Sequence, residues 1–128
     1  MANVITVKYV SDDINPNLRY DVMLPRSESI IPAVNAIKAI DGYINVAVVE
    51  YDDKLTLNDN LEYVFKIMQN GVITDSWTLS PPDGLTALVE PIIHNNQTYG
   101  HRSLSMGDVL EVDGVEYVCA MIGFTKVG

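Results

Sequence analysis

The two histidines and the single cysteine are the residues of this chain best suited to metal binding or nucleophilic catalysis. No pair among His94, His101 and Cys119 has the short spacing of a zinc site such as Cys-x-x-Cys. Cys119 stands in an apolar and aromatic run, which favours a small buried side chain over a reactive thiolate. We therefore predict no metal, no cofactor and no catalytic residue, and a protein that is not an enzyme.

A second candidate site combines aromatic side chains with an arginine. Trp77, Tyr99, His101 and Arg102 are predicted to line a pocket for a nucleotide-like small molecule, in which Arg102 would hold a phosphate. Trp77 has two other interpretations, because tryptophan is common both in cores and at binding hot spots. The sequence leaves these alternatives open.

Acidic side chains dominate the charge of the chain. Its formal net charge is −9, with 17 acidic against 8 basic residues. Two clusters are readable, one made of Glu50, Asp52, Asp53, Asp59 and Glu62, the other of Asp108, Glu111, Asp113 and Glu116. Such faces either keep a protein soluble or steer a basic partner. The charge disfavours direct nucleic-acid binding and binding to anionic membranes.

The size and composition of the chain predict one domain over residues 1–128. Hydrophobic residues make up 48%, enough for a single core. No apolar run approaches the roughly 20 residues of a membrane helix, and the N-terminal residues do not resemble a signal peptide. With one cysteine and no disulfide, we expect a cytoplasmic protein.

The first half of the sequence predicts two strands, a helix and a third strand. Val4–Val10 and Leu18–Leu24 alternate as strands and are predicted to pair as a hairpin with a long loop. Ser27 or Ser29 is expected to cap the following helix, which ends at Asp41-Gly42 with Gly42 in the left-handed conformation. Tyr43–Tyr51 is apolar on both faces, which is typical of a central strand.

The second half begins with a predicted helix over Asn58–Gln69, capped by Thr56 or Asn58. Tyr63 lies opposite its apolar stripe and is a further candidate for partner binding. Leu85–Glu90 is predicted as a short strand, and Asn95–Gly100 as a polar loop.

The C-terminal part contains the clearest local signal. Asp113-Gly114 separates the predicted strands Asp108–Val112 and Val115–Ile122, which indicates a tight hairpin. Phe124–Val127 follows after Gly123. Together these elements predict an α+β fold, with a mostly antiparallel sheet, two helices and a C-terminal β-hairpin.

From Leu61 onward the sequence resembles small proteins of bacteriophages and other mobile elements called YodL-like. The resemblance rests on Leu61-Glu62-x-Val64-Phe65, Asn70, Trp77, Arg102-Ser103-x-Ser105-x-Gly107-Asp108-Val109, Asp113-Gly114, Tyr117-Val118-Cys119 and Gly123-Phe124. It covers about half of the chain and implies an accessory protein of a phage or mobile element. It implies no catalytic residues.

Turn chemistry accounts for the residue types of this motif without a ligand. Ser103 and Ser105 are expected to bond local backbone, Gly107 to take unusual dihedral angles, and Arg102 to pair with Asp108 or a carbonyl.

The combined features predict a non-enzymatic accessory protein that binds a host or defence protein, one with a basic surface. In the sharpest form, the acidic surface would occupy a basic nucleic-acid channel. Two alternatives are a self-associating virion or assembly component, which would be a homo-oligomer, and a protein that sequesters a nucleotide-like molecule.

Overall fold

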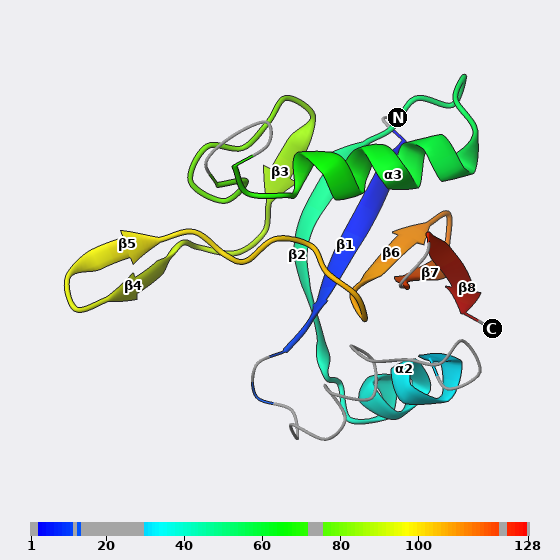
Figure 1. Ribbon diagram of the computed structural model, residues 1–128, viewed down its shortest axis with the longest axis horizontal. Coiled ribbons are helices and arrows are strands. Elements are labelled where there is room, and N and C mark those ends of the chain that lie inside the picture. Colours follow the sequence, from blue (N-terminus) through cyan, green and yellow to red (C-terminus); the bar gives the residue numbers. More distant parts are fainter. Residues whose placement is uncertain (1–2, 12, 14–29, 72–75, 121–122, 128) are drawn as a thin grey trace.

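The computed structural model describes residues 3–11, 13, 30–71, 76–120 and 123–127. These residues form two helices, a six-stranded antiparallel sheet and a separate two-stranded hairpin (Figure 1). The α+β fold predicted from the sequence is confirmed. The predicted strand Leu18–Leu24 and the predicted caps Ser27 and Ser29 lie outside the described residues.

The large sheet has the strand order β3-β2-β1-β6-β7-β8. Its strands are β1 (Val4–Val10), β2 (Tyr43–Glu50), β3 (Leu85–Ala87), β6 (Val109–Val112), β7 (Val115–Cys119) and β8 (Phe124–Val127). Every neighbouring pair is antiparallel. β1 lies in the middle, between β2 and β6, so that Ile5 pairs with both Val49 and Val112.

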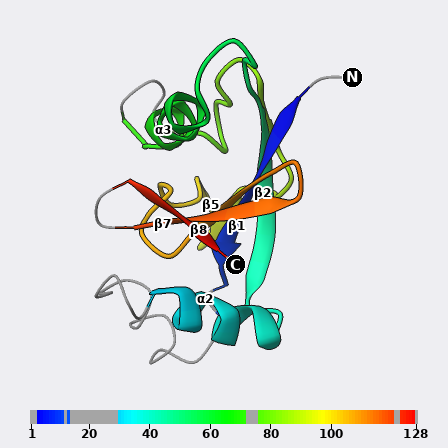
Figure 2. The ribbon, with the colours of Figure 1, turned by 90° about the vertical axis from the view of Figure 1, so that its right-hand side faces the viewer.

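The two helices cover opposite faces of this sheet. They are α2 (Ile30–Ala39) and α3 (Leu57–Ile67). Successive strand residues point to opposite faces, and on β6 Val109 packs in the cluster of α2 while Leu110 packs in the cluster of α3. Figure 2 shows the same arrangement from the side, with β7 and β8 between the two helices.

Each face has its own hydrophobic cluster. The larger cluster contains Ile5, Val7, Tyr9, Val46, Ala47, Val49, Leu61, Val64, Ile67, Met68, Trp77, Leu85, Leu104, Leu110 and Val112. The smaller cluster contains Val10, Ile30, Ala33, Val34, Ile37, Val109, Val118 and Val127. The sheet is therefore buried on both sides near its centre.

The ends of the helices follow local side-chain chemistry. The Thr56 hydroxyl accepts a hydrogen bond from the Asp59 backbone N–H at 3.1 Å and caps α3, as one of the two predicted caps. At the end of α2, Asp41 takes the left-handed conformation with a φ of 53°, and the prediction for Gly42 is wrong. Aspartate tolerates this conformation, and the Gly42 N–H then donates to the Ile37 carbonyl at 2.8 Å.

The predicted C-terminal hairpin is confirmed. Asp113 and Gly114 have φ values of 51° and 81° and turn β6 into β7. β7 ends at Cys119, short of the predicted Ile122, which is outside the described residues. β8 then pairs with β7 at the edge of the sheet.

The polar segment predicted as a loop forms a second hairpin instead. β4 (Ile92–His94) pairs with β5 (Gln97–Tyr99), and Asn95 and Asn96 turn the chain with φ values of 50° and 63°. Asparagine adopts these values more readily than most residues, so this turn does not require glycine. The hairpin projects from the body of the molecule (Figure 1).

Candidate partner-binding surface

One of the four residues predicted to line a small-molecule pocket belongs to the packed interior instead. Trp77 is fully buried, so it is a core residue and not an exposed interface anchor. Its Nε1 donates to the Arg102 carbonyl oxygen at 2.9 Å, and its ring lies 6.0 Å from the ring of His101. Tyr99, by contrast, is exposed on β5.

Arg102 makes a two-pronged ion pair with Asp108. Its Nη1 and Nη2 lie 2.6 Å and 2.8 Å from the two carboxylate oxygens. The Asp108 carboxylate is completely buried and also accepts from the backbone N–H groups of Val10 and Ser105, at 3.0 Å and 2.9 Å. The guanidinium carbon lies 4.2 Å from the centre of the Tyr9 ring. This pair therefore connects β1 to the segment that precedes β6.

Two tyrosine hydroxyls reinforce the same region. Tyr9 donates to the Arg102 carbonyl at 3.0 Å, and Tyr43 donates to the Gly107 carbonyl at 2.7 Å. Burial, with a further contribution from the Asp108 charge, raises the pKa of both hydroxyls well above the usual value. Both remain neutral hydrogen-bond donors at physiological pH.

The remaining motif residues also have structural roles. The Ser103 hydroxyl accepts from the Asn70 backbone N–H at 2.9 Å, just beyond α3. Gly107 has a φ of 91°, as predicted, and its N–H donates to the Cys119 carbonyl at 2.9 Å. The motif thus joins the end of α3 to the central strands, and its described contacts stabilise the fold.

The second predicted acidic cluster is not an unpaired acidic surface. Asp108 is buried, and this part of the prediction is wrong because Arg102 and backbone donors enclose its carboxylate. Lys8 lies 3.1 Å from both Glu111 and Glu116, and Lys38 of α2 also pairs with Glu116. Asp113 is exposed and accepts a hydrogen bond from the Tyr51 hydroxyl.

These ion pairs control the protonation of their members. Partial burial of Glu116 would raise its pKa, but hydrogen bonds from Lys38 and Lys8 outweigh that effect and lower it. Partial burial of Lys8 would lower its pKa, but Glu111 and Glu116 outweigh that effect and raise it. Glu116 therefore stays ionised and holds α2 against the sheet.

The first acidic cluster is exposed throughout. We call Glu50, Asp52, Asp53, Asp59 and Glu62 the β2–α3 acidic surface, because they lie at the end of β2, in the connection and on α3. The Asn60 side chain fixes this connection, since its Nδ2 donates to the Asp52 and Thr56 carbonyls at 2.8 Å and 3.2 Å. These contacts hold the backbone of the connection that carries Asp52 and Asp53.

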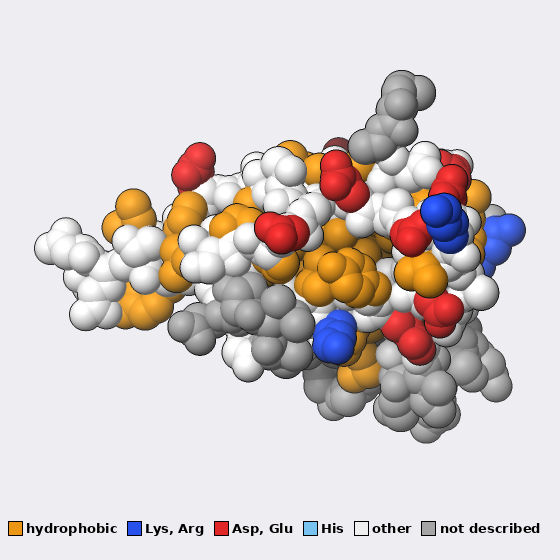
Figure 3. Space-filling model, turned by 90° about the horizontal axis from the view of Figure 1, so that it is seen from above, with side chains coloured by type: hydrophobic (Ala, Val, Ile, Leu, Met, Phe, Trp, Pro, Cys, Tyr) orange, Lys and Arg blue, Asp and Glu red, His pale blue; other side chains and the backbone are white. Residues whose placement is uncertain are grey.

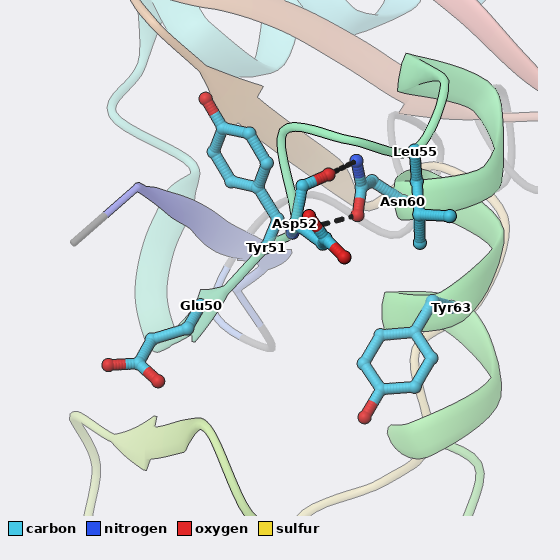
Figure 4. A pocket seen from close by; sticks show the side chains of 6 residues that line it. All are labelled: Glu50, Tyr51, Asp52, Leu55, Asn60 and Tyr63. Carbon is cyan, nitrogen blue, oxygen red and sulfur yellow. Dashed lines mark hydrogen bonds between the residues drawn. The ribbon is translucent and has the colours of Figure 1, made fainter.

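A hollow of about 460 Å³ lies within this surface (Figure 4). It is lined by Glu50, Tyr51, Asp52, Leu55, Asn60 and Tyr63. Tyr63 extends from α3, while Glu50 and Asp52 come from the end of β2 and the residues after it (Figure 4). The hollow combines two aromatic side chains and an aliphatic one with two carboxylates.

A second hollow, of about 440 Å³, shares Tyr63 with the first. Its other lining residues are Lys66, Ile67, Ser80, Pro81, Pro82 and Asp83. Tyr63 is 46% exposed and Leu55 is 49% exposed, so both are accessible to a partner. Seen from the side of α3, acidic side chains lie around hydrophobic ones, with few basic side chains among them (Figure 3).

Within the described residues, no group of three or more His, Cys, Asp or Glu side chains is placed to hold a metal ion. Cys119 is buried, and burial together with the Asp108 charge raises the pKa of its thiol to about 12. Neither of the described helices is long and apolar enough to cross a membrane.

Comparisons with protein-family models, with curated proteins and with solved structures each give no match. The β2–α3 acidic surface, with exposed Tyr63 and Leu55 in its hollow, is therefore the candidate site.

Proposed function

We propose that this chain is a non-enzymatic accessory protein of a phage or mobile element, and that it binds a host or defence protein through the β2–α3 acidic surface. The observation that carries the proposal is the hollow in which exposed Tyr63 and Leu55 lie beside Glu50 and Asp52. The phage or mobile-element origin is supported by the sequence resemblance alone.

An apolar centre with a charged rim is the usual anatomy of a protein-binding surface. A tyrosine supplies contact area at a small cost in side-chain entropy and is frequent among binding hot spots. The surrounding carboxylates favour a partner with basic side chains and speed its approach. A basic protein segment that places an apolar side chain against Tyr63 satisfies both features.

Capture of a partner from host lysate tests this role if matched variants are used as bait. The first variant carries Glu50→Gln, Asp53→Asn and Glu62→Gln. The control carries Asp13→Asn, Asp41→Asn and Glu90→Gln, three exposed acids elsewhere with the same change in net charge. Circular dichroism verifies that both variants are folded.

We expect the first variant to lose about tenfold or more of the captured partner while the control retains it. We also expect capture to fall steeply between about 50 and 200 mM salt, since exposed charges are screened over that range. An equal loss in both variants would show that net charge alone matters. Capture that is unaffected by salt would contradict a contact made through carboxylates.

If the partner binds nucleic acid, the acidic surface has a more specific role as an occupant of the basic channel. A nucleic-acid duplex added to the purified complex would then displace the protein in proportion to its concentration. A ternary complex with both ligands bound would contradict this version and leave the binding role intact.

A further inference from the structure

The β4–β5 hairpin is an arm that the rest of the described chain does not cover. All six of its strand residues are exposed, and Ile93 is 75% exposed. The arm, residues 91–100, extends away from the sheet and both helices (Figure 1). Large apolar side chains in such a position are unusual in a monomeric protein.

Each face of the arm carries an exposed apolar side chain. Ile92 pairs with Tyr99, and Ile93 pairs with Thr98. Cross-strand partners share a face and neighbours along a strand alternate, so Ile92 and Tyr99 occupy one face and Ile93 the other. Two-stranded hairpins are at best marginally stable alone in water, and a covered apolar face stabilises them.

The base of the arm is firmly attached to the body. The His101 ring nitrogen Nε2 lies 2.8 Å from the Glu90 carbonyl oxygen, and the His101 N–H donates to the Thr78 hydroxyl at 3.1 Å. A Cβ on Gly100 would lie 1.9 Å from the Ser76 Oγ, so the backbone approaches here as only glycine allows. The arm therefore emerges at a defined position.

The charge distribution favours one kind of binding partner for the arm. The stretch from Pro91 to His101 is the longest run in the sequence without Asp, Glu, Lys or Arg. Two copies of a chain with a net charge of −9 repel each other, and they repel least where their contacting segments are uncharged. A basic partner, in contrast, is attracted to the β2–α3 acidic surface. The two surfaces thus suit different partners.

We propose that the arm is the contact through which this chain associates with a second copy of itself, arm against arm. A two-fold axis through the contact would make the interface self-complementary and closed. Association would bury Ile93, the most exposed apolar side chain of the arm, and stabilise the hairpin. This inference is independent of the proposed host partner, because its test contains the purified chain alone.

Sedimentation equilibrium over a wide range of protein concentration provides the first test. We expect a concentration-dependent dimer, and we expect Ile93→Asp to raise its dissociation constant about tenfold or more, because each copy would bury a carboxylate. The control is Ile40→Asp, since Ile40 is also an exposed isoleucine, just beyond α2. A strict monomer at every concentration, or equal weakening by both variants, would overturn the proposal.

Cysteine cross-linking identifies the contact directly. Thr98→Cys places a thiol on the arm, and Thr86→Cys places one on the exposed edge strand β3, while native Cys119 is buried. We expect a reducible covalent dimer with the first variant and none with the second. Cross-linking with Thr86→Cys alone would place the contact at β3 and contradict the role of the arm.

Discussion

At the scale of single residues, Asp108 is the most constrained side chain described. It is fully buried, and its two oxygens accept from one guanidinium and two backbone N–H groups. A buried charge is tolerated when all its hydrogen-bond and ion-pair partners are present. Removal of one partner leaves an uncompensated buried charge and destabilises the folded state. We therefore expect the Arg102–Asp108 pair to stabilise the folded state.

We expect Asp108→Asn to lower the free energy of unfolding by about 2–4 kcal/mol, because Arg102 would lose its counter-charge and the backbone donors an acceptor. Asp113→Asn is the control, since Asn-Gly suits the same turn and Asp113 is exposed. Urea unfolding of the two variants measures the difference. Similar small losses in both would mean that the buried pair contributes little.

Sequence reasoning is accurate for residues whose role is local. Thr56 and Asp113-Gly114 act through neighbours within a few positions, and both predictions are confirmed. The pairing of Arg102 with Asp108 is also one of the predicted contacts and is confirmed. The acidic-surface prediction for Asp108 is wrong because the sequence does not show that the Val10 backbone of β1 also encloses this carboxylate. Burial depends on contacts between distant segments, which one sequence does not reveal.

At the scale of elements, α2 is held to the sheet by apolar packing and by the ion pairs of Glu116. Ile30, Val34 and Ile37 pack in the smaller cluster, and Lys38 reaches Glu116 on β7. Since the folded-state pKa of Glu116 is below its ordinary value of 4.5, its ionised form stabilises the folded state. That stabilisation is present above pH 4.5 and is lost as pH falls through the lower, folded-state pKa.

We therefore expect Glu116→Gln to destabilise the protein at pH 7 and the difference from wild type to shrink below about pH 4.5. Urea unfolding at several pH values between 7 and 3 measures this trend. Glu111→Gln is the matched control, because Glu111 pairs with Lys8 whereas Glu116 pairs with both Lys8 and Lys38. A difference that grows on acidification would contradict the sign of the linkage.

The base of the β4–β5 arm gives a second prediction for an element. Gly100→Ala would drive its Cβ into the Ser76 side chain and displace the arm. Adding Ser76→Gly removes the clashing atoms, so we expect the double variant to recover part of the lost stability. Thermal unfolding of the single and double variants measures the recovery. If the losses of stability from the two substitutions simply added, the contact between residue 100 and Ser76 would not be the cause of the destabilisation.

The arm was missed by sequence reasoning for a physical reason. Asn95 to Gly100 contains one large apolar side chain, Tyr99, and the alternation that marks a half-buried strand is absent because nothing described covers the hairpin. The helices, whose apolar stripes face a core, were predicted close to their observed bounds. The order of strands in the sheet could not be predicted, because β1 pairs with β6, which lies near the other end of the chain.

At the scale of the whole molecule, net charge and local charge have different consequences. The chain carries −9, yet Glu111 and Glu116 are neutralised by lysines that come from distant elements. The β2–α3 acidic surface persists because its members lie in one short, exposed segment. The first cluster is therefore exposed as a group, whereas members of the second cluster are buried or paired with lysines.

A chain with this charge repels itself when compact, and salt should relieve that repulsion. We expect the melting temperature at pH 7 to rise by a few degrees between about 20 and 300 mM sodium chloride. The triple variant Glu50→Gln, Asp53→Asn, Glu62→Gln should show a smaller rise, because it removes three of the repelling groups. A fall with salt would indicate that the lysine ion pairs dominate instead.

The place of β1 at the centre of the sheet has a consequence for synthesis on the ribosome. The second edge of β1 can pair only after β6 has been synthesised, because Ile5 pairs with Val112. At about 20 residues per second, translation of the intervening chain takes roughly five seconds. During that time a nascent strand rich in β-branched residues has one open edge, which is the kind of intermediate that chaperones protect.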